Sequence, residues 1–298
     1  MRALAEYIMR GRTQAALVVG LTAALPMLFW ISAAGASLVL LRKGVNQSLG
    51  VIVWALVPAG LWASYGDPFV LLVIGGSLTL AHVLRNSESW LRVLMTSLLV
   101  GLSSAGVLSV IFAASIAQLG EVLSEALPAV FAAVWQDLSA DEQARLLELL
   151  VPVLTGLMAA VAQMLALAAL VLARYWQAAL YNPGGFGQEF RAIRLPVAIA
   201  ALLVMGMLLA PRLSAQAGMI MPLCAIVLGL AGLAVVHGLA ARYRTSRFLL
   251  TGFYVGLFLF SQLLFPLLVI LALADSVFDF RGLRALAKNN ADPTDNGE

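Results

Sequence analysis

Opposite charges and aromatic rings are gathered in one short motif near the carboxyl end of the chain, DSVFDFRGLR at residues 275–284. Asp275, Asp279 and Arg281 supply two carboxylates and a guanidinium, with phenylalanines between them. Opposite charges this close in sequence can pair with one another and stabilise the end of a helix. They can equally form charge-assisted hydrogen bonds with a second protein. An ion-paired helix end and a docking element are both open interpretations of this motif.

The two histidines are the next candidates for chemistry. His82 lies about one helical turn before Arg85, and His237 lies similarly close to Arg242, so both are expected near a membrane surface rather than at depth. If the fold brings them together, two imidazoles can form a proton or ligand site. If it keeps them apart, they are ordinary polar side chains at helix ends.

Neutral amides are further polar groups within or beside the long apolar segments. They can bind a neutral ligand without any charge, or they can simply join neighbouring helices by hydrogen bonds. The candidates are Asn46, Gln47, Gln163 and Gln262.

The apolar segments lack acidic and basic side chains except for Arg92 and Arg247, which lie at or close to segment ends. Intramembrane charges normally mark ion paths and proton relays, so this pattern disfavours an ion-coupled transporter, an ion channel and an intramembrane metalloprotease. Cys224 is the only cysteine, and alone it cannot form an intramolecular disulfide or a cysteine metal site. The chain also contains no Walker A pattern. The sequence therefore predicts a non-enzyme with no catalytic residue, metal or cofactor.

Composition indicates which elements must position these side chains. The chain has 298 residues, 62% of them hydrophobic and 11% charged, and its mean hydropathy is +0.97. A soluble domain carries about 25% charged residues, so a soluble protein, a nucleic-acid-binding protein and a disulfide scaffold are excluded. A membrane crossing needs about 20 apolar residues, and we expect an all-α polytopic transmembrane bundle with about 8–9 membrane helices. The apolar segments are 14–41, 45–65, 68–84, 90–117, 149–173, 195–211, 217–240 and 247–274.

The first and last apolar segments each carry a central proline, Pro26 and Pro266. Each segment is either one kinked helix or two short pieces joined at a break. Two pieces joined near Pro26 would return the amino-terminal Arg2, Arg10 and Arg12 to the side where cations are expected. We favour that interpretation for the first segment.

Lysine and arginine in short loops predict which loops are cytoplasmic. Four alternate connections carry these cations, namely Arg42 with Lys43, Arg85 with Arg92, Arg174 with Arg191 and Arg194, and Arg242 with Arg244 and Arg247. The acidic loop 118–148 is then expected on the outer side. Within it, Ser139 and Glu142 match a capping box and predict the start of a helix.

The whole arrangement predicts one integral membrane domain over residues 1–288. Its core helices are expected at about 14–173 and its additional helices at about 195–274. The polar tail 289–298 is expected to be disordered because it has almost no apolar side chains to bury.

Loop 174–194 carries Trp176, which suits a membrane interface, and a turn signal at Asn182, Gly184 and Gly185. The stretch from Arg174 to Gly187, together with the 275–281 part of the charged motif, resembles the YybS-like family of uncharacterised bacterial multi-pass membrane proteins. The resemblance covers most of the chain and implies the bacterial inner (cytoplasmic) membrane, without an activity. The first half is also similar in fold to the S-components of energy-coupling-factor transporters and to MreD-type proteins. That similarity implies a substrate-binding core.

Two functions are compatible with this pattern. The first is a non-enzymatic small-molecule binding or transport component with a neutral intramembrane site. The alternative is a membrane scaffold or assembly partner that docks other proteins through loop 174–194 and motif 275–284. The expected partners are the lipid bilayer and either a neutral ligand or a membrane protein, with no nucleic acid. The candidate ligand or docking residues are Asn46, Gln47, His82, Gln163, Trp176, Asn182, Gly184, Gly185, His237, Gln262, Asp275, Asp279 and Arg281.

Overall fold

The computed structural model describes residues 2–242 and 246–282, and every regular element in these ranges is a helix. This confirms the all-α fold class. Arg244, the last residues of the charged motif and the tail 289–298 lie outside the described residues. The described chain forms two compact units within the stretch that we expected as one domain. Among the described residues, the first unit comprises 2–183 and 206–226, and the second comprises 184–205, 227–242 and 246–282.

Six helices of the described chain are long and apolar enough to cross a membrane, which fits a membrane-embedded protein. Two further apolar helices are shorter, so the count of 8–9 crossings stays a prediction. The six are Val45–Ser64, Phe69–Ser87, Trp90–Val110, Ala140–Tyr181, Ala217–Ala240 and Ser261–Phe278, and the two shorter ones are Val197–Leu213 and Phe248–Leu259.

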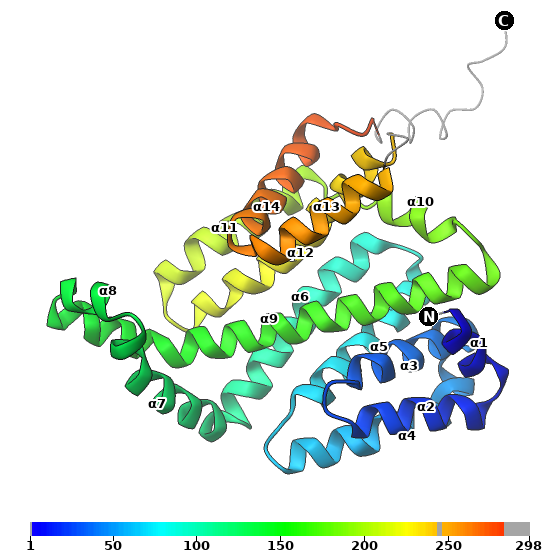
Figure 1. Ribbon diagram of the computed structural model, residues 1–298, viewed down its shortest axis with the longest axis horizontal. Coiled ribbons are helices and arrows are strands. Elements are labelled where there is room, and N and C mark those ends of the chain that lie inside the picture. Colours follow the sequence, from blue (N-terminus) through cyan, green and yellow to red (C-terminus); the bar gives the residue numbers. More distant parts are fainter. Residues whose placement is uncertain (1, 243–245, 283–298) are drawn as a thin grey trace, which may run out of the picture. The chain divides into compact units, whose positions relative to one another are not determined.

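The helices of the first unit follow one another with short connections (Figure 1). Helices α11 (Val197–Leu213) and α12 (Ile220–Ala240) are divided between the units, and residues 206–226 around their connection belong to the first. The helices wholly within the first unit are α1 (Arg2–Arg10), α2 (Arg12–Ala24), α3 (Phe29–Lys43), α4 (Val45–Ser64), α5 (Phe69–Ser87), α6 (Trp90–Val110), α7 (Ala113–Val130), α8 (Ala132–Asp137) and α9 (Ala140–Tyr181).

The first apolar segment is two helices, as we favoured from Pro26. Helix α2 ends at Ala24, α3 begins at Phe29, and the two pack side by side as a hairpin (Figure 1). The turn between them is apolar, and Met27 takes a left-handed φ of 43° there. The indole Nε1 of Trp30 donates to the carbonyl of Met27 at 2.9 Å, which satisfies one backbone acceptor of the turn.

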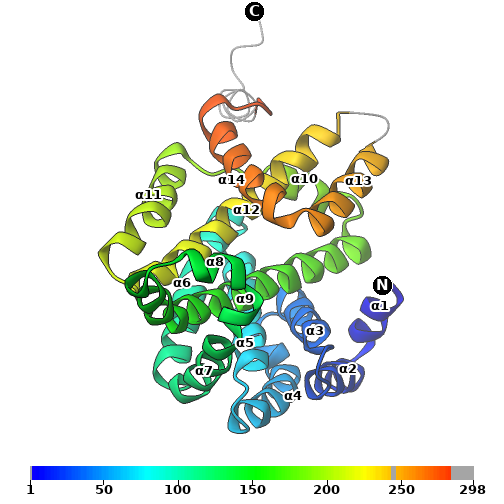
Figure 2. The same ribbon diagram turned by 60° about the vertical axis from the view of Figure 1, so that its left-hand side comes forward.

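The acidic loop is helical rather than irregular. Helices α7 and α8 lead into α9 (Figure 2). The first turn of α9 is polar and precedes its apolar part. The predicted capping box is confirmed: the Ser139 side chain accepts from the backbone N–H of Glu142, and the Glu142 carboxylate accepts from the backbone N–H of Ser139 at 2.9 Å. This cap fixes where the long helix α9 begins.

Small side chains let the helices of the first unit approach closely. Helix α3 buries Ala33, Ala34, Gly35 and Ala36, and it packs against α5 and α9. The hydroxyl of Ser37 on α3 donates to that of Ser77 on α5 at 3.3 Å. Small residues and hydroxyl contacts of this kind are typical of helix packing in membranes.

The second unit contains α10 (Gly185–Arg191), α13 (Ser246–Leu259), α14 (Ser261–Phe278) and the remaining parts of α11 and α12. Helices α12 and α14 approach closely at Gly232, where an added Cβ would come within 2.1 Å of the Leu268 carbonyl oxygen. The last apolar segment is also two helices, but they separate at Phe260, while Pro266 lies inside α14. A proline inside a helix removes one backbone N–H, and its ring crowds the carbonyl four residues earlier. A membrane helix tolerates this when neighbouring groups satisfy the freed carbonyl.

Candidate functional site

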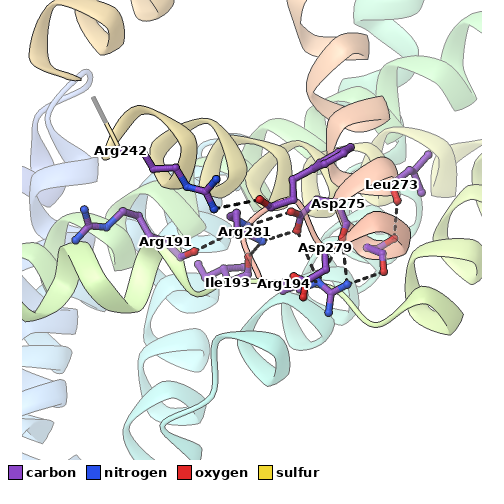
Figure 3. Close-up of polar contacts among 10 residues, drawn as sticks. Arg191, Ile193, Arg194, Arg242, Leu273, Asp275, Asp279 and Arg281 are labelled. Atoms are coloured by element: carbon purple, nitrogen blue, oxygen red, sulfur yellow. Dashed lines mark hydrogen bonds and ion pairs between the residues drawn. The ribbon is translucent and has the colours of Figure 1, made fainter. Parts of the chain in front are cut away.

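The clearest cluster of ionic side chains in the described chain lies in the second unit, around the end of α14 (Figure 3). Asp275 and Arg281 form its centre, and their exposed fractions are only 1% and 8%. Arg281 donates from Nη2 to Oδ2 of Asp275 at 2.7 Å and from Nε to Oδ1 at 3.3 Å. A two-point contact of this kind fixes the angle of the guanidinium as well as its distance.

The same guanidinium also binds the segment that follows α10. Its Nη1 donates to the carbonyl of Arg191 at 2.6 Å, and its Nη2 donates to the carbonyl of Ile193 at 2.8 Å. Arg281 therefore joins the charged motif to residues about ninety positions earlier in the chain. We name the set Arg191, Ile193, Arg194, Asp275, Asp279 and Arg281 the ionic cluster (Figure 3).

Arg194 closes the other side of the ionic cluster. Its Nη2 donates to the carbonyls of Asp275 at 3.1 Å and Ser276 at 2.8 Å, which lie in the last turn of α14. Its Nε lies 3.5 Å from Oδ1 of Asp279. The last carbonyls of a helix have no partner within the helix, so a cation placed there satisfies them and complements the helix dipole.

The local backbone explains why the chain turns back at this point. Asp279 ends α14 with a left-handed φ of 51°, and its N–H donates to the carbonyl of Asp275 at 2.9 Å. Gly282 follows with a φ of 67°. On the neighbouring α12, a Cβ added to Gly238 would come within 2.7 Å of Cδ of Arg281. The glycine leaves room for the arginine side chain.

The ionic cluster neutralises its own charge, with Arg194 and Arg281 facing Asp275 and Asp279. Both carboxylate oxygens of Asp275 accept hydrogen bonds from Arg281. Arg281 also donates to the backbone carbonyls of Arg191 and Ile193. Within the described residues no group of three or more metal-ligating side chains occurs. The two-point contact and the backbone bonds make the ionic cluster a rigid joint between the end of α14 and the segment that follows α10.

The aromatic side chains of the motif are arranged differently from its charges. Phe278 and Phe280 are exposed by 72% and 44%, and their rings stack with centroids 5.8 Å apart. Arg242 donates to the carbonyl of Phe280 at 3.1 Å, which holds the backbone beneath the second ring. The motif thus buries the ion pair between Asp275 and Arg281 and exposes the rings of Phe278 and Phe280.

The histidines lie in different units. His237 has its Nε2 2.8 Å from the Tyr254 hydroxyl, and its ring packs edge-on against Phe190, with centroids 5.2 Å apart. In the first unit, Nε2 of His82 lies 3.0 Å from the amide nitrogen of Asn86 on the same helix. Each imidazole therefore has its own local partner.

Gln163 is the one predicted amide that is fully buried. Its Nε2 donates to the Ser97 hydroxyl at 3.2 Å and to the Leu223 carbonyl at 3.4 Å, and so joins α6, α9 and α12. Its Oε1 has no hydrogen-bond partner among the described residues. A Cβ on Gly101 would lie 2.7 Å from that oxygen, so the glycine backbone packs directly against it.

The other amide candidates are exposed. Asn46 and Gln47 lie in the first turn of α4, and Gln262 lies in the first turn of α14. Within the first unit, the amides of Asn46 and Gln47 are thus at the surface, whereas Gln163 is enclosed by helices.

The candidate residues of loop 174–194 lie at the end of α9 and at the start of α10. Trp176 is buried on α9, one turn after the buried Ala173, instead of lying at an interface as we expected. The predicted turn is present: Asn182 caps the end of α9, Gly184 takes a left-handed φ of 90°, and Gly185 begins α10. Only a residue without a Cβ adopts that φ readily.

Sequence reasoning missed Arg194 as a partner of the motif. The sequence signals for this pairing were Arg194, a cation in a short loop, and the acidic pair Asp275 and Asp279 at the end of a span. The nearest cation to that acidic pair in sequence is Arg281. Many other cations also lie in short loops, so the pairing itself needs the fold.

No family model, curated protein or solved structure matches this chain. The resemblance to the YybS-like family and the fold-level similarity to S-components stay predictions.

Proposed function

We propose that this protein is a non-enzymatic membrane scaffold that docks a second protein through the surface around the ionic cluster. The observation that carries the proposal is that the end of loop 174–194, at Arg191, Ile193 and Arg194, meets the described part of motif 275–284 there. Both segments were singled out as docking elements. Arg281 and Arg194 bind the two segments to each other. A scaffold needs such a surface to be held rigid, because a preordered surface pays less entropy on binding.

We assign partner binding to the exposed phenylalanine rings of the motif rather than to its buried ion pair. Phe278, Phe280 and Val277 are exposed, whereas Asp275 and Arg281 are buried. Aromatic side chains that are rigid and solvent-accessible are typical binding anchors. Arg242 donates to the carbonyl of Phe280, and Arg191 donates to the carbonyl of Gly187. Neither arginine has a carboxylate partner within the described residues. The partner that fits is a segment with apolar side chains and acidic residues next to them.

The proposed sidedness is cytoplasmic, in a bacterial inner membrane, with the acidic helices α7 and α8 on the outer side. Its support is the charge distribution. Arginines are concentrated in the connections 174–194 and 242–247, whereas the connection 118–148 contains six acidic residues and one arginine.

Site-specific photo-crosslinking tests the docking surface. Phe278 or Phe280 is replaced by benzoylphenylalanine in the full-length protein, expressed in its native membrane. The matched controls are Phe258 and Phe260, which are exposed on the same α13–α14 pair but away from the ionic cluster. We expect one protein to crosslink at positions 278 and 280 and not at the two controls. That protein, once purified, should bind the F278A/F280A variant at least about tenfold more weakly than the original chain, as for loss of an interface anchor.

Crosslinks to lipid alone at positions 278 and 280 would overturn the docking proposal. The same applies to an identical protein pattern at all four positions, since general membrane crowding would then explain it.

The neutral small-molecule site is the second candidate, and Gln163 is the observation that favours it. Its buried Oε1 accepts no hydrogen bond within the described chain, and a bound donor could satisfy it. Mass spectrometry of organic extracts from the purified protein and from Gln163→Leu tests this function. A metabolite that is present in stoichiometric amount and lost in the variant would support it, whereas identical extracts would exclude it at this position.

A further inference from the structure

Five cations gather at one end of the first unit, and we name them the basic rim: Arg10, Arg12, Arg42, Lys43 and Arg85. The α2–α3 hairpin brings the start of α2 back beside the end of α3. Arg85, in the last turn of α5, donates to the carbonyl of Leu41 near the end of α3. The five positions therefore lie where four neighbouring helices, α1, α2, α3 and α5, begin or end.

No carboxylate in the described chain forms an ion pair with any of these five side chains. The acidic residues closest to these cations in sequence are Glu6 and Glu88. Glu6 pairs with Arg2 at 2.9 Å, and Glu88 ends α5 without an ion pair in the described structure. The basic rim thus differs from the ionic cluster of the second unit, where cations and carboxylates balance.

Two of the guanidiniums are held in place rather than extended freely into solvent. Arg42 lies over the ring of Tyr181, 4.2 Å from its centroid. Arg85 lies against Gly44, where a Cβ would come within 3.2 Å of Nη2, and Gly44 takes a left-handed φ of 81°. Cation–π contacts and backbone acceptors restrict these groups while leaving most of their N–H donors unused.

The basic rim lies where the apolar parts of its helices stop. Helix α3 is apolar up to Leu41 and then continues with Arg42 and Lys43. Side chains at this boundary reach the level of the lipid phosphates. A guanidinium matches a phosphate geometrically through paired N–H donors.

We propose that the basic rim binds the phosphate of anionic phospholipids, with Arg42 and Arg85 as the oriented donors and Lys43, Arg10 and Arg12 adding charge. The chemistry is that of a phosphodiester or phosphate monoester. Its source is the surrounding leaflet, because the cations continue from membrane-spanning helices. This inference is independent of the docking surface in the second unit.

Native mass spectrometry tests the site on the full-length protein in detergent, with phosphatidylglycerol or phosphatidylcholine added. We expect phosphatidylglycerol to be retained preferentially, and its retention to fall as salt rises. The R42Q/K43Q variant should lose retention by about tenfold or more, as for lost charge-assisted bonds to phosphate. Arg145→Gln removes an exposed cation elsewhere in the same unit and should leave retention unchanged.

Arg85→Gln is a second variant, but it also removes the bond to Leu41, so R42Q/K43Q is the decisive one. Equal retention of the two lipids, or unchanged retention in R42Q/K43Q, would overturn the proposal. Competition by millimolar inorganic phosphate as strong as that by phosphatidylglycerol would assign the site to a soluble phosphate and overturn its assignment to lipid.

Discussion

Asp275 and Arg281 are nearly excluded from solvent, so the energetics of their pair depend on both partners being present. Two charges removed from water are tolerated because each satisfies the other, and Arg281 also binds two backbone carbonyls. Removal of Arg281 leaves the buried carboxylate of Asp275 with only the more distant Arg194, whose Nε lies 3.7 Å from Oδ2. The ionic cluster is therefore a point where a single substitution has a large effect, although a buried pair is not necessarily more stable than an apolar one.

Arg281→Gln is expected to lower the free energy of unfolding by about 3–5 kcal/mol, because the Asp275 carboxylate loses its closest cation. Reversible unfolding of the purified protein in mixed micelles measures this change. The control is Arg2→Gln, which breaks the exposed pair with Glu6 and should cost about 0–1 kcal/mol. The double variant D275N/R281Q should cost less than the sum of its single substitutions. Additive costs would contradict direct coupling between the two side chains.

Gly232 lies where α12 packs closely against α14. A Cβ at Gly232 would meet backbone, the Leu268 carbonyl oxygen at 2.1 Å, so α12 and α14 must separate in Gly232→Ala. We expect this variant to lose about 1–3 kcal/mol of unfolding free energy through overpacking.

Gly252 supplies the matched control. Gly252 and Gly256 form a G-x-x-x-G pattern in α13. A Cβ added to Gly252 would nevertheless meet nothing within 4 Å. Gly252→Ala should therefore be neutral or stabilise by up to about 1 kcal/mol through helix propensity. A greater loss in Gly252→Ala than in Gly232→Ala would show that the pattern in α13, and not the α12–α14 contact, is the important interface.

At the scale of the element, the α2–α3 hairpin is short for a membrane crossing. Its helices contain 13 and 15 residues. At about 1.5 Å per residue they reach about 20–22 Å, whereas the hydrocarbon core is about 30 Å thick. We expect the apolar turn, with Met27 82% exposed, to end within hydrocarbon.

Cysteine labelling checks this depth, since Cys224 is the only native thiol. In a Cys224→Ala background, the thiol of Met27→Cys should resist a charged, membrane-impermeant maleimide applied to either face of proteoliposomes. Gln47→Cys and Gln136→Cys, both exposed positions in the first unit, should react from opposite faces. Reaction of Met27→Cys from the face that labels Gln136→Cys would instead make the hairpin a full crossing.

Local signals predicted the elements best where one physical cause acts alone. The capping box at Ser139 and Glu142 depends only on neighbours three residues apart, and it is present. The break near Pro26 was anticipated for the same reason. In the last segment, however, the helices separate at Phe260 and not at Pro266, because tertiary packing competes with the local effect of proline.

At the scale of the whole molecule, composition was enough to predict helices suited to a membrane, because too few charged residues exist to cover a soluble surface. It could not predict the ionic cluster. Arg194 and Asp275 are 81 residues apart, and periodicity says nothing about which helix ends meet. Composition could not predict the division into two units either. Residues 206–226 belong to the first unit, although in sequence they follow residues 184–205 of the second.

The two units depend on different contacts, which leads to a prediction about the whole chain. The first unit is packed through small residues and through buried polar contacts such as that between Ser37 and Ser77. The second unit depends on the ionic cluster, in which Arg281 joins the segment after α10 to the end of α14. Loss of that joint should open the second unit locally, because stability is distributed in cooperative units.

Hydrogen–deuterium exchange of Arg281→Gln in detergent measures this directly. We expect faster exchange in residues 184–205 and 227–242 and at the end of α14, and unchanged exchange in α3 and α5. Gln163→Leu is the reciprocal variant, because Gln163 joins α6, α9 and the first part of α12 within the first unit. It should raise exchange in α6 and α9 and leave the end of α14 unchanged. Uniform acceleration across the chain in either variant would mean that the two units unfold as one cooperative body.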